Sequence, residues 1–177
     1  MRENTLLGFT FLLFICSCKP AATEQQNTNS EYFDIKGYFD KEIARLSKLQ
    51  PTIKKTVAVN NELETKALRI KDWKQELTAF SEAEINRASW KGLFAVSKTD
   101  SVQRYLSNNE KVPVKEITIS SNKGEIKKIL VVIQNKNILY TSLDSLTYCI
   151  DSLYQVKKQQ NIRFLSDKNY LIEGRFK

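Results

Sequence analysis

From Trp90 to the C-terminus, apolar residues recur at every second position in short runs that are separated by turn residues. This period of two places apolar side chains on one face of a β-strand and polar side chains on the other. The runs are joined by short turns such as Asn122-Lys123-Gly124 and the segment 166–169. Short connections favour antiparallel pairing of consecutive strands, so this half of the chain is predicted to form an antiparallel meander in sequence order.

Pro113 places one of the predicted strands toward a sheet edge or a strand start, because proline cannot donate a ladder hydrogen bond. The run from Ile126 to Ile133 is the most apolar strand pattern in the chain. We expect strand segments within the ranges 90–96, 112–119, 126–133, 138–142, 146–150, 154–156, 162–164 and 170–176.

The first half of the chain has a different pattern, which begins with an amphipathic helix. Residues 31–50 carry apolar side chains at a spacing of three to four, which is typical of a helix with one buried face. Ser30 is placed to cap this helix and Pro51 to end it. Gly37 is expected to make the midpoint of the helix its weakest part.

A hairpin and a second helix follow. Residues 53–70 read as two strands joined at Asn60-Asn61, and Asp72 with Gln75 matches a capping box for a helix that reaches about Arg87. The predicted fold class is therefore α+β. We expect a curved antiparallel meander sheet of about seven to nine strands, with one or both helices on its concave face.

The N-terminal region has the pattern of a secretory signal. Leu6 to Ile15 is an apolar run of about ten residues, which as a helix spans about 15 Å, half the thickness of a bilayer core. A transmembrane helix needs about twenty such residues, so this run is interpreted as the apolar region of a signal peptide.

The next four residues, Ile15-Cys16-Ser17-Cys18, resemble the lipobox of bacterial lipoproteins, in which a small residue precedes the modified cysteine. This resemblance implies cleavage before Cys18, a diacylglycerol on its sulfur, and usually an N-acyl chain such as palmitate. The alternative is an ordinary cleaved signal that ends in cysteine. Two or three acyl chains anchor a protein stably, because each buried methylene contributes about 0.8 kcal/mol.

The chain is thus predicted to have three parts: a signal peptide (1–17), a lipidated Cys18 with a disordered polar tether (18–30), and one α+β domain (31–177). Lys19 is not the aspartate that retains many lipoproteins at the inner membrane. By analogy with that family, we expect the protein in the outer membrane, facing the periplasm.

Several classes of chemistry are excluded by composition. The chain has no histidine, which removes Ser-His-Asp and Cys-His catalysis and imidazole metal sites. Its five glycines form no nucleotide-binding loop.

If Cys16 is cleaved off and Cys18 acylated, Cys149 remains alone, and its place in a strand predicts a buried, inert thiol. Ser120 and Lys123 match an SxxK string, but it runs into a turn. We expect no enzymatic activity and no cofactor.

The charge balance is basic, with 28 Lys+Arg against 20 Asp+Glu and a net charge of +8. Paired lysines in or beside strands either protect sheet edges or form a surface for anionic lipid, glycan or envelope proteins. Nucleic acid is a poor candidate, because no stacking motif accompanies the charge. The candidate contacts are Lys54, Lys55, Lys127, Lys128, Lys157 and Lys158.

Three further positions share the pattern Asp-Ser-apolar. This pattern resembles the O-glycosylation acceptor motif of one group of Gram-negative bacteria, which modifies exported proteins. Asp-Ser also suits turns and strand ends, and that alternative stays open. The candidate serines are Ser101, Ser145 and Ser152.

Two functions remain open at this point. The first is a non-enzymatic binding or scaffolding domain on a membrane-anchored lipoprotein. The second is a periplasmic carrier of lipids or other hydrophobic ligands, whose sheet resembles a half-barrel at the level of architecture only. A carrier needs an apolar cavity that its helices do not fill, whereas a scaffold is packed solid and exposes an apolar patch or a basic face.

Overall fold

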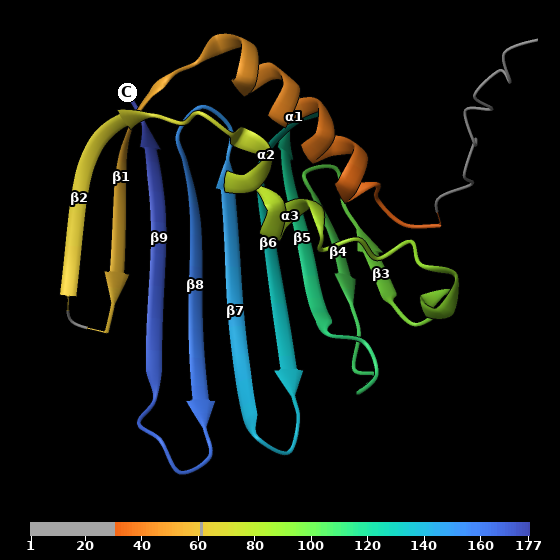
Figure 1. Cartoon of the computed structure of the whole chain (residues 1–177). Coiled ribbons are helices and arrows are strands. Elements are labelled where there is room, and N and C mark those ends of the chain that lie inside the picture. The colour runs from red at the N-terminus through yellow and green to blue at the C-terminus, as the bar shows by residue number, and fades with distance from the viewer. Residues whose placement is uncertain (1–30, 61) are drawn as a thin grey trace, which may run out of the picture.

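A computed structural model describes residues 31–60 and 62–177 as a nine-stranded antiparallel open sheet with helices on one face (Figure 1). The signal peptide, Cys18 and the tether predicted for residues 1–30 lie outside the described residues. Within the described residues, no helix is both long and apolar enough to cross a membrane.

The first elements in chain order are α1 (Ile35–Leu49), β1 (Thr52–Val59), β2 (Glu62–Arg69), α2 (Trp73–Glu76), α3 (Thr78–Ser81) and the 3-10 turn η1 (Ala88–Trp90). The strands that follow are β3 (Ala95–Lys98), β4 (Val102–Leu106), β5 (Val114–Asn122), β6 (Glu125–Lys136), β7 (Tyr140–Cys149), β8 (Leu153–Ile162) and β9 (Lys168–Phe176).

The strand order across the sheet is β2-β1-β9-β8-β7-β6-β5-β4-β3. The meander predicted in sequence order is confirmed from β3 to β9, where each strand pairs with the next. The hairpin predicted over residues 53–70 is also confirmed, as β1 and β2, and it joins the sheet because β1 pairs antiparallel with β9, for example at Val57 opposite Ile172. The first and last strands of the chain therefore lie side by side, and β2 and β3 form the two edges.

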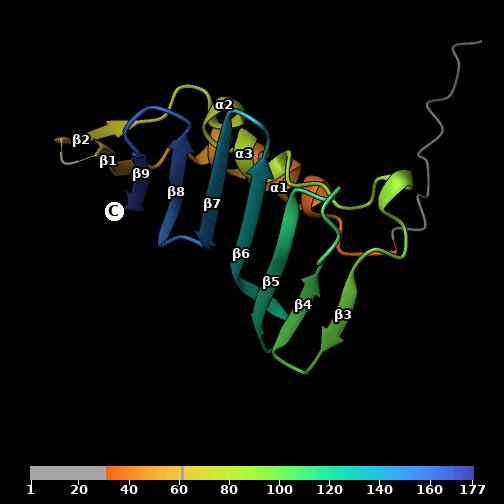
Figure 2. The same ribbon diagram turned by 90° about the horizontal axis from the view of Figure 1, so that it is seen from below.

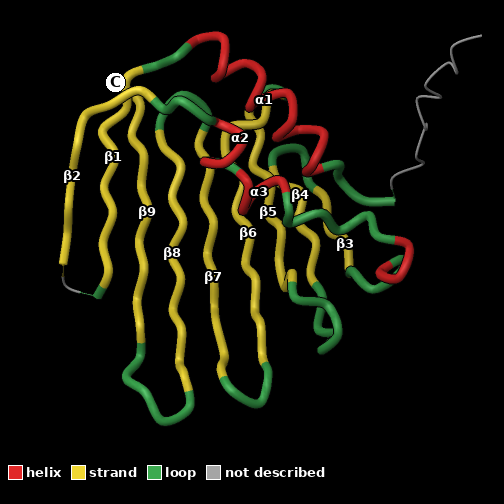
Figure 3. Tube along the Cα trace, viewed as in Figure 1, coloured by secondary structure: helices red, strands yellow, loops and turns green. Residues whose placement is uncertain are grey.

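The helices α1, α2 and α3 lie against one face of the sheet, over one end of the strands, and leave the other half of that face uncovered (Figures 1 and 3). A view from below shows the twist of the sheet and the helices on one side of it (Figure 2). Alternate strand residues such as Leu146, Tyr148 and Tyr154 are buried beneath the helices. They pack with Phe39 of α1 and Phe80 of α3; for example, the Phe39 and Tyr148 ring centroids lie 5.3 Å apart.

The cap of α1 differs from the expectation. Asp34, rather than Ser30, caps the helix, and its Oδ1 accepts a hydrogen bond of 2.8 Å from the Gly37 amide. Because α1 begins at Ile35, Gly37 lies in the first turn and not at the midpoint. At the other end, Gln50 adopts a left-handed conformation before Pro51, as a helix stop requires.

The second predicted helix is shorter than expected. Asp72 does cap it, since its side chain accepts a 3.0 Å hydrogen bond from the Gln75 amide. The helix is interrupted at Leu77, where φ is −101°, and the extension to Arg87 is wrong. Trp73, Leu77 and Phe80 are all buried, so the apolar stripe predicted for this helix does face the sheet, and their burial does not explain the break.

Strand boundaries differ at four places. The fragments 154–156 and 162–164 are one strand, β8, and Phe164 lies in the loop after it. β4 was not predicted, because its five residues include Gln103 and Arg104 and only Tyr105 is fully buried. The segment expected as a strand over 90–96 contains the last residue of η1 and only the start of β3. The fragments 138–142 and 146–150 are one strand, β7, in which polar Ser142 and Asp144 occupy positions facing the helix-bearing side.

Candidate binding surface on the helix-free sheet face

The face of the sheet opposite the helices is mostly polar. In β7, Leu146 and Tyr148 point toward the helices, so Leu143, Ser145 and Thr147 point the other way. We call this surface the helix-free face. Because it carries no covering layer among the described residues, its side chains are accessible for binding.

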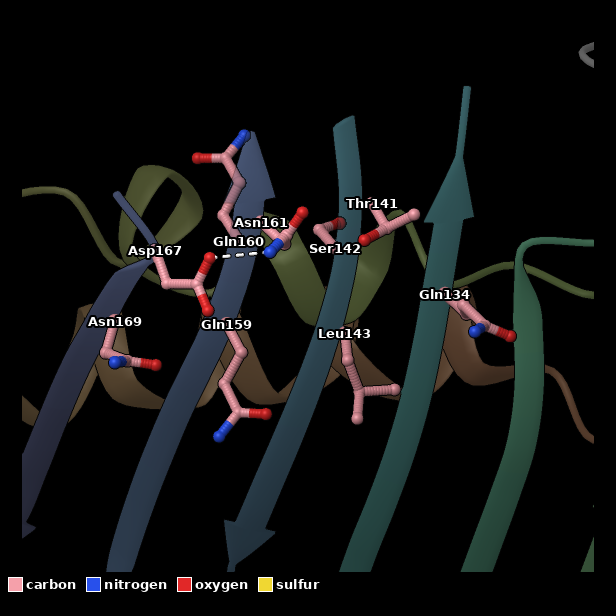
Figure 4. A pocket seen from close by; sticks show the side chains of 9 residues that line it. All are labelled: Gln134, Thr141, Ser142, Leu143, Gln159, Gln160, Asn161, Asp167 and Asn169. Carbon is pink, nitrogen blue, oxygen red and sulfur yellow. Dashed lines mark hydrogen bonds between the residues drawn. The ribbon is translucent and has the colours of Figure 1, made fainter. Parts of the chain in front are cut away.

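A hollow of about 420 Å³ lies on the helix-free face at the end of the strands that the helices leave uncovered (Figure 4). By strand register, the hollow faces the carboxamides of Gln134, Gln159, Asn161 and Asn169 and the hydroxyl of Thr141, whereas the side chains of Ser142 and Gln160 point to the helix-bearing face. Asn161 donates a hydrogen bond of 2.6 Å to Asp167, which fixes both side chains at one rim. The lining residues are Gln134, Thr141, Ser142, Leu143, Gln159, Gln160, Asn161, Asp167 and Asn169.

The strand register builds the centre of this hollow. Gln134 of β6 lies opposite Leu143 of β7, Leu143 lies opposite Gln159 of β8, and Gln159 lies opposite Asn169 of β9. Neighbouring strands are spaced about 4.8 Å apart, so these side chains form a regular transverse row. Carboxamides both donate and accept hydrogen bonds, and such a row presents them at a fixed pitch.

A second hollow of about 370 Å³ continues the first toward the β2 edge of the sheet. The two hollows share Gln159 and Asn169, and the second adds the exposed Lys157 together with Leu171 and Leu63. The combined surface therefore runs from β6 to β2. It is amide-rich at one end, and cationic and partly apolar at the other.

The six candidate lysines do not form one patch, because adjacent residues in a strand face opposite sides. Exposed Lys54, Lys128 and Lys157 lie on the helix-free face, by their registers with Arg175, Cys149 and Leu171. The other three are ion-paired: Lys55 with Glu76 at 2.6 Å, Lys127 with Glu125 at 2.7 Å, and Lys158 with Asp144 at 3.2 Å.

The three candidate glycosylation serines lie in different settings. Ser101 is exposed in the turn before β4, and Ser152 is exposed in the turn between β7 and β8. Ser145 is half-buried in the middle of β7, between Val132 of β6 and Lys157 of β8. Ser101 and Ser152 therefore have the accessibility that a modifying enzyme needs, and Ser145 has less of it.

Sequence reasoning missed a buried ionic cluster between α1 and the sheet. Glu42 is only 7% exposed; it accepts a hydrogen bond from the Tyr148 hydroxyl and two from the Arg45 guanidinium, which also contacts Asp151 at 2.7 Å. Burial and the bond to Glu42 raise the pKa of Tyr148 well above its usual range. Burial also raises the pKa of nearby Tyr38 to about 12.

A second cluster repeats this arrangement under α2. The Tyr154 hydroxyl donates a 2.7 Å hydrogen bond to Glu76, which also pairs with Lys55. Burial, followed by this hydrogen bond, raises the pKa of Tyr154. Both clusters join a helix carboxylate to a sheet tyrosine and a cation, so they fix the helices to the sheet.

A sequence signal for the first cluster does exist. Glu42 lies three residues after Phe39 and four before Leu46, on the apolar stripe of α1. A carboxylate on such a stripe needs a buried partner, and that requirement could have identified it.

Cys149 is half-buried in β7 and faces the helix-free side. The thiol predicted to be buried is therefore partly exposed. Across the residues that the structure describes, no group of three or more His, Cys, Asp or Glu side chains could hold a metal ion.

No protein-family model matches the chain, and the searches of curated proteins and of solved structures gave no match either.

Proposed function

We propose that this protein is a cell-envelope lipoprotein, anchored through acylated Cys18, whose folded part is a non-enzymatic binding domain. The anchor rests on the lipobox-like residues 15–18 and the apolar run before them. The proposed location is the outer membrane, facing the periplasm. The observation that carries the binding role is the polar hollow on the helix-free face.

We further propose that this face binds an envelope glycan that carries anionic groups. The carboxamides of the transverse row, with the Thr141 hydroxyl beside them, match the closely spaced hydroxyls of a sugar chain, each of which donates and accepts. At the other end of the surface, Lys157 has no ion-pair partner among the described residues and can meet a carboxylate or phosphate. A scaffold linking the membrane to an envelope polymer follows from these two contacts.

The alternative, a carrier of hydrophobic ligands with a curved, half-barrel-like sheet, has less support. A carrier needs apolar space between helices and sheet. Here aromatic rings occupy that layer: Phe39 and Phe80 lie 5.0 Å apart between centroids, and both pack on Tyr148.

Binding of soluble, carboxylate-bearing cell-wall glycan fragments to the full chain in detergent micelles tests the binding role, with calorimetry as the readout. We expect the double substitution Gln159→Ala and Asn169→Ala to weaken binding at least tenfold, which is about 1.4 kcal/mol. The control is Gln75→Ala, an exposed carboxamide on α2, and it should leave the affinity unchanged. Equal affinities for all three proteins would place the ligand elsewhere.

The anchor and the carrier alternative are tested by mass. The purified chain should have the mass of residues 18–177 plus a diacylglycerol and an acyl group, and Cys18→Ala should prevent the modification. A further non-covalent lipid that organic extraction removes would favour the carrier. An unmodified mass would contradict the anchor and leave the binding face unaffected.

A further inference from the structure

Two neighbouring hairpin loops carry four large, exposed apolar side chains, among them the three most exposed of the described residues. They connect β6 to β7 and β8 to β9, and we call residues 137–139 together with 163–167 the loop tip. The exposed fractions are 84% for Ile138, 69% for Leu139, 91% for Phe164 and 64% for Leu165. Isolated exposed apolar residues are ordinary, but four large ones at one end of a molecule indicate a contact surface.

The two loops form one ordered unit. The Arg163 amide donates a 2.9 Å hydrogen bond to the Leu139 carbonyl, which joins one loop to the other. Within the first loop, the Asn137 side chain accepts hydrogen bonds of 2.8 Å from the amides of Leu139 and Tyr140. Figure 1 shows both loops at the end of the sheet away from the helices and the C-terminus. The apolar side chains are therefore presented together by a rigid base.

Phe164 is held in a conformation that folding alone does not favour. Its φ is +67°, in the left-handed region that bulky residues rarely adopt, and its ring is almost fully exposed. A glycine or asparagine would satisfy this turn at lower conformational cost. An exposed aromatic ring on a strained backbone gives the fold no packing in return, which points to a role in binding.

The charges around the loop tip identify the partner. Lys136, Arg163 and Lys168 are exposed and form no ion pair within the described residues. The Arg163 guanidinium lies 4.9 Å from the Phe164 ring centroid. Two acidic side chains lie at or beside the loop tip: Asp167, which accepts a hydrogen bond from Asn161, and Glu110, which lines a hollow together with Lys136 and Ile138. The combination of apolar side chains and cations matches an anionic lipid surface. The apolar side chains can enter the acyl-chain region, and the cations can contact the anionic headgroups.

We propose that the loop tip inserts Ile138, Leu139, Phe164 and Leu165 into an anionic lipid bilayer, while Lys136, Arg163 and Lys168 contact its headgroups. This contact uses none of the carboxamides of the glycan surface and needs no acylation at Cys18. The two surfaces meet at Asp167, which lines the hollow and belongs to the loop tip. In a lipid-anchored chain it orients the sheet end-on to a membrane. In a chain without an anchor it supplies reversible attachment.

Insertion is tested with the full chain carrying Phe164→Trp, mixed with vesicles of phosphatidylglycerol and phosphatidylcholine at roughly one to three. The vesicle lipids carry brominated acyl chains, which quench an indole within the hydrocarbon region. We expect the indole introduced at position 164 to lose most of its fluorescence. The signals of native Trp73 and Trp90 are subtracted with the wild-type chain.

The matched control is Leu49→Trp, at an exposed site (59%) at the end of α1, on the opposite end of the molecule. It should remain unquenched even when an anchor holds the chain on the vesicle. Replacing Lys136, Arg163 and Lys168 with glutamine, in the Phe164→Trp chain, should remove most of the quenching. Circular dichroism confirms that these surface variants are folded.

Two outcomes overturn the proposal. If the Phe164→Trp chain is unquenched, the loop tip does not enter lipid and is instead a surface for a protein partner. If Leu49→Trp is quenched equally, the chain contacts the bilayer without the proposed orientation. Neither outcome bears on glycan binding at Gln159 and Asn169, so failure of this proposal is distinguishable from failure of the proposed function.

Discussion

At the residue scale, Gly174 of β9 gives Tyr154 the room to lie flat across the sheet. A Cβ atom added at Gly174 would lie 2.2 Å from the Tyr154 ring, far inside van der Waals contact. The ring is fully buried and its hydroxyl bonds Glu76, so it has no free space into which it can move.

We therefore expect Gly174→Ala to lower the free energy of unfolding by about 2–3 kcal/mol, as overpacking does in a dense core. Urea denaturation measures the change. The control is Gly124→Asn in the β5–β6 turn, where φ is +81° and no atom lies within 4 Å of an added Cβ. A loss smaller than that of the control would show that the Tyr154 ring relocates freely.

The buried tyrosines predict a loss of stability at alkaline pH. Unfolded tyrosine ionises near pH 10, whereas burial raises the pKa of Tyr148 and Tyr154 in the folded chain. Above pH 10 the unfolded state releases protons that the folded state retains, so the free energy of unfolding falls as pH rises. The expected slope is about 1.4 kcal/mol per pH unit for each such tyrosine. Below pH 10 the tyrosine is protonated in both states, and its full contribution to the free energy of unfolding is present.

Urea titrations between pH 8 and pH 11.5, the range that contains this ionisation, measure the slope. Tyr148→Phe should reduce it by about 1.4 kcal/mol per pH unit, because phenylalanine has no proton to release. The same slope in the wild-type chain and the variant would contradict the claim that folded Tyr148 keeps its proton above pH 10.

At the element scale, the start of α1 depends on a pair of residues rather than on one cap. The Asp34 carboxylate lies so close to Gly37 that a Cβ there would be 2.1 Å from Asp34 Oδ2. Glycine normally weakens a helix by about 1 kcal/mol relative to alanine. Here it accommodates the cap, so the local cost is offset by the hydrogen bond that the cap makes.

A double-mutant cycle on α1 tests this coupling. We expect Asp34→Ala to cost about 1 kcal/mol and Gly37→Ala alone to destabilise. In the Asp34→Ala background, Gly37→Ala should instead stabilise the chain by up to about 1 kcal/mol. The clash with the carboxylate is then absent, and alanine has a higher helix propensity than glycine. Thermal unfolding provides the readout, and effects that simply add would refute the coupling.

At the scale of the whole molecule, β9 connects the N-terminal hairpin to the rest of the sheet. β9 pairs with β1 on one side and with β8 on the other. Residues 168–177 therefore hold a hairpin that lies about one hundred residues earlier in the sequence.

Ending the chain after Asp167 should abolish cooperative unfolding, because it removes Ile172 and Phe176, which pack against the core that contains Ile53. Circular dichroism during urea denaturation measures this. Removing only Lys177, which donates one 3.2 Å hydrogen bond to Thr52, serves as the control and should cost at most about 1 kcal/mol. A truncated chain that still unfolds in one sharp transition would show that β9 is dispensable.

The sequence alone determined the elements with strong local patterns. The alternation of apolar residues predicted most strands, and Lys123-Gly124 adopts the positive φ values that a tight hairpin turn requires. Asp72 acts as the predicted cap. These features depend on a few neighbouring residues, so the chain itself specifies them.

Only the tertiary structure decided which strands lie together and which faces meet. The pairing of β1 with β9, the ionic cluster around Glu42 and the loop tip each join residues that are distant in the sequence. The register also separated the paired lysines to opposite faces and aligned Gln134, Gln159 and Asn169 in one hollow. Such contacts arise from packing between elements, which a local pattern does not encode.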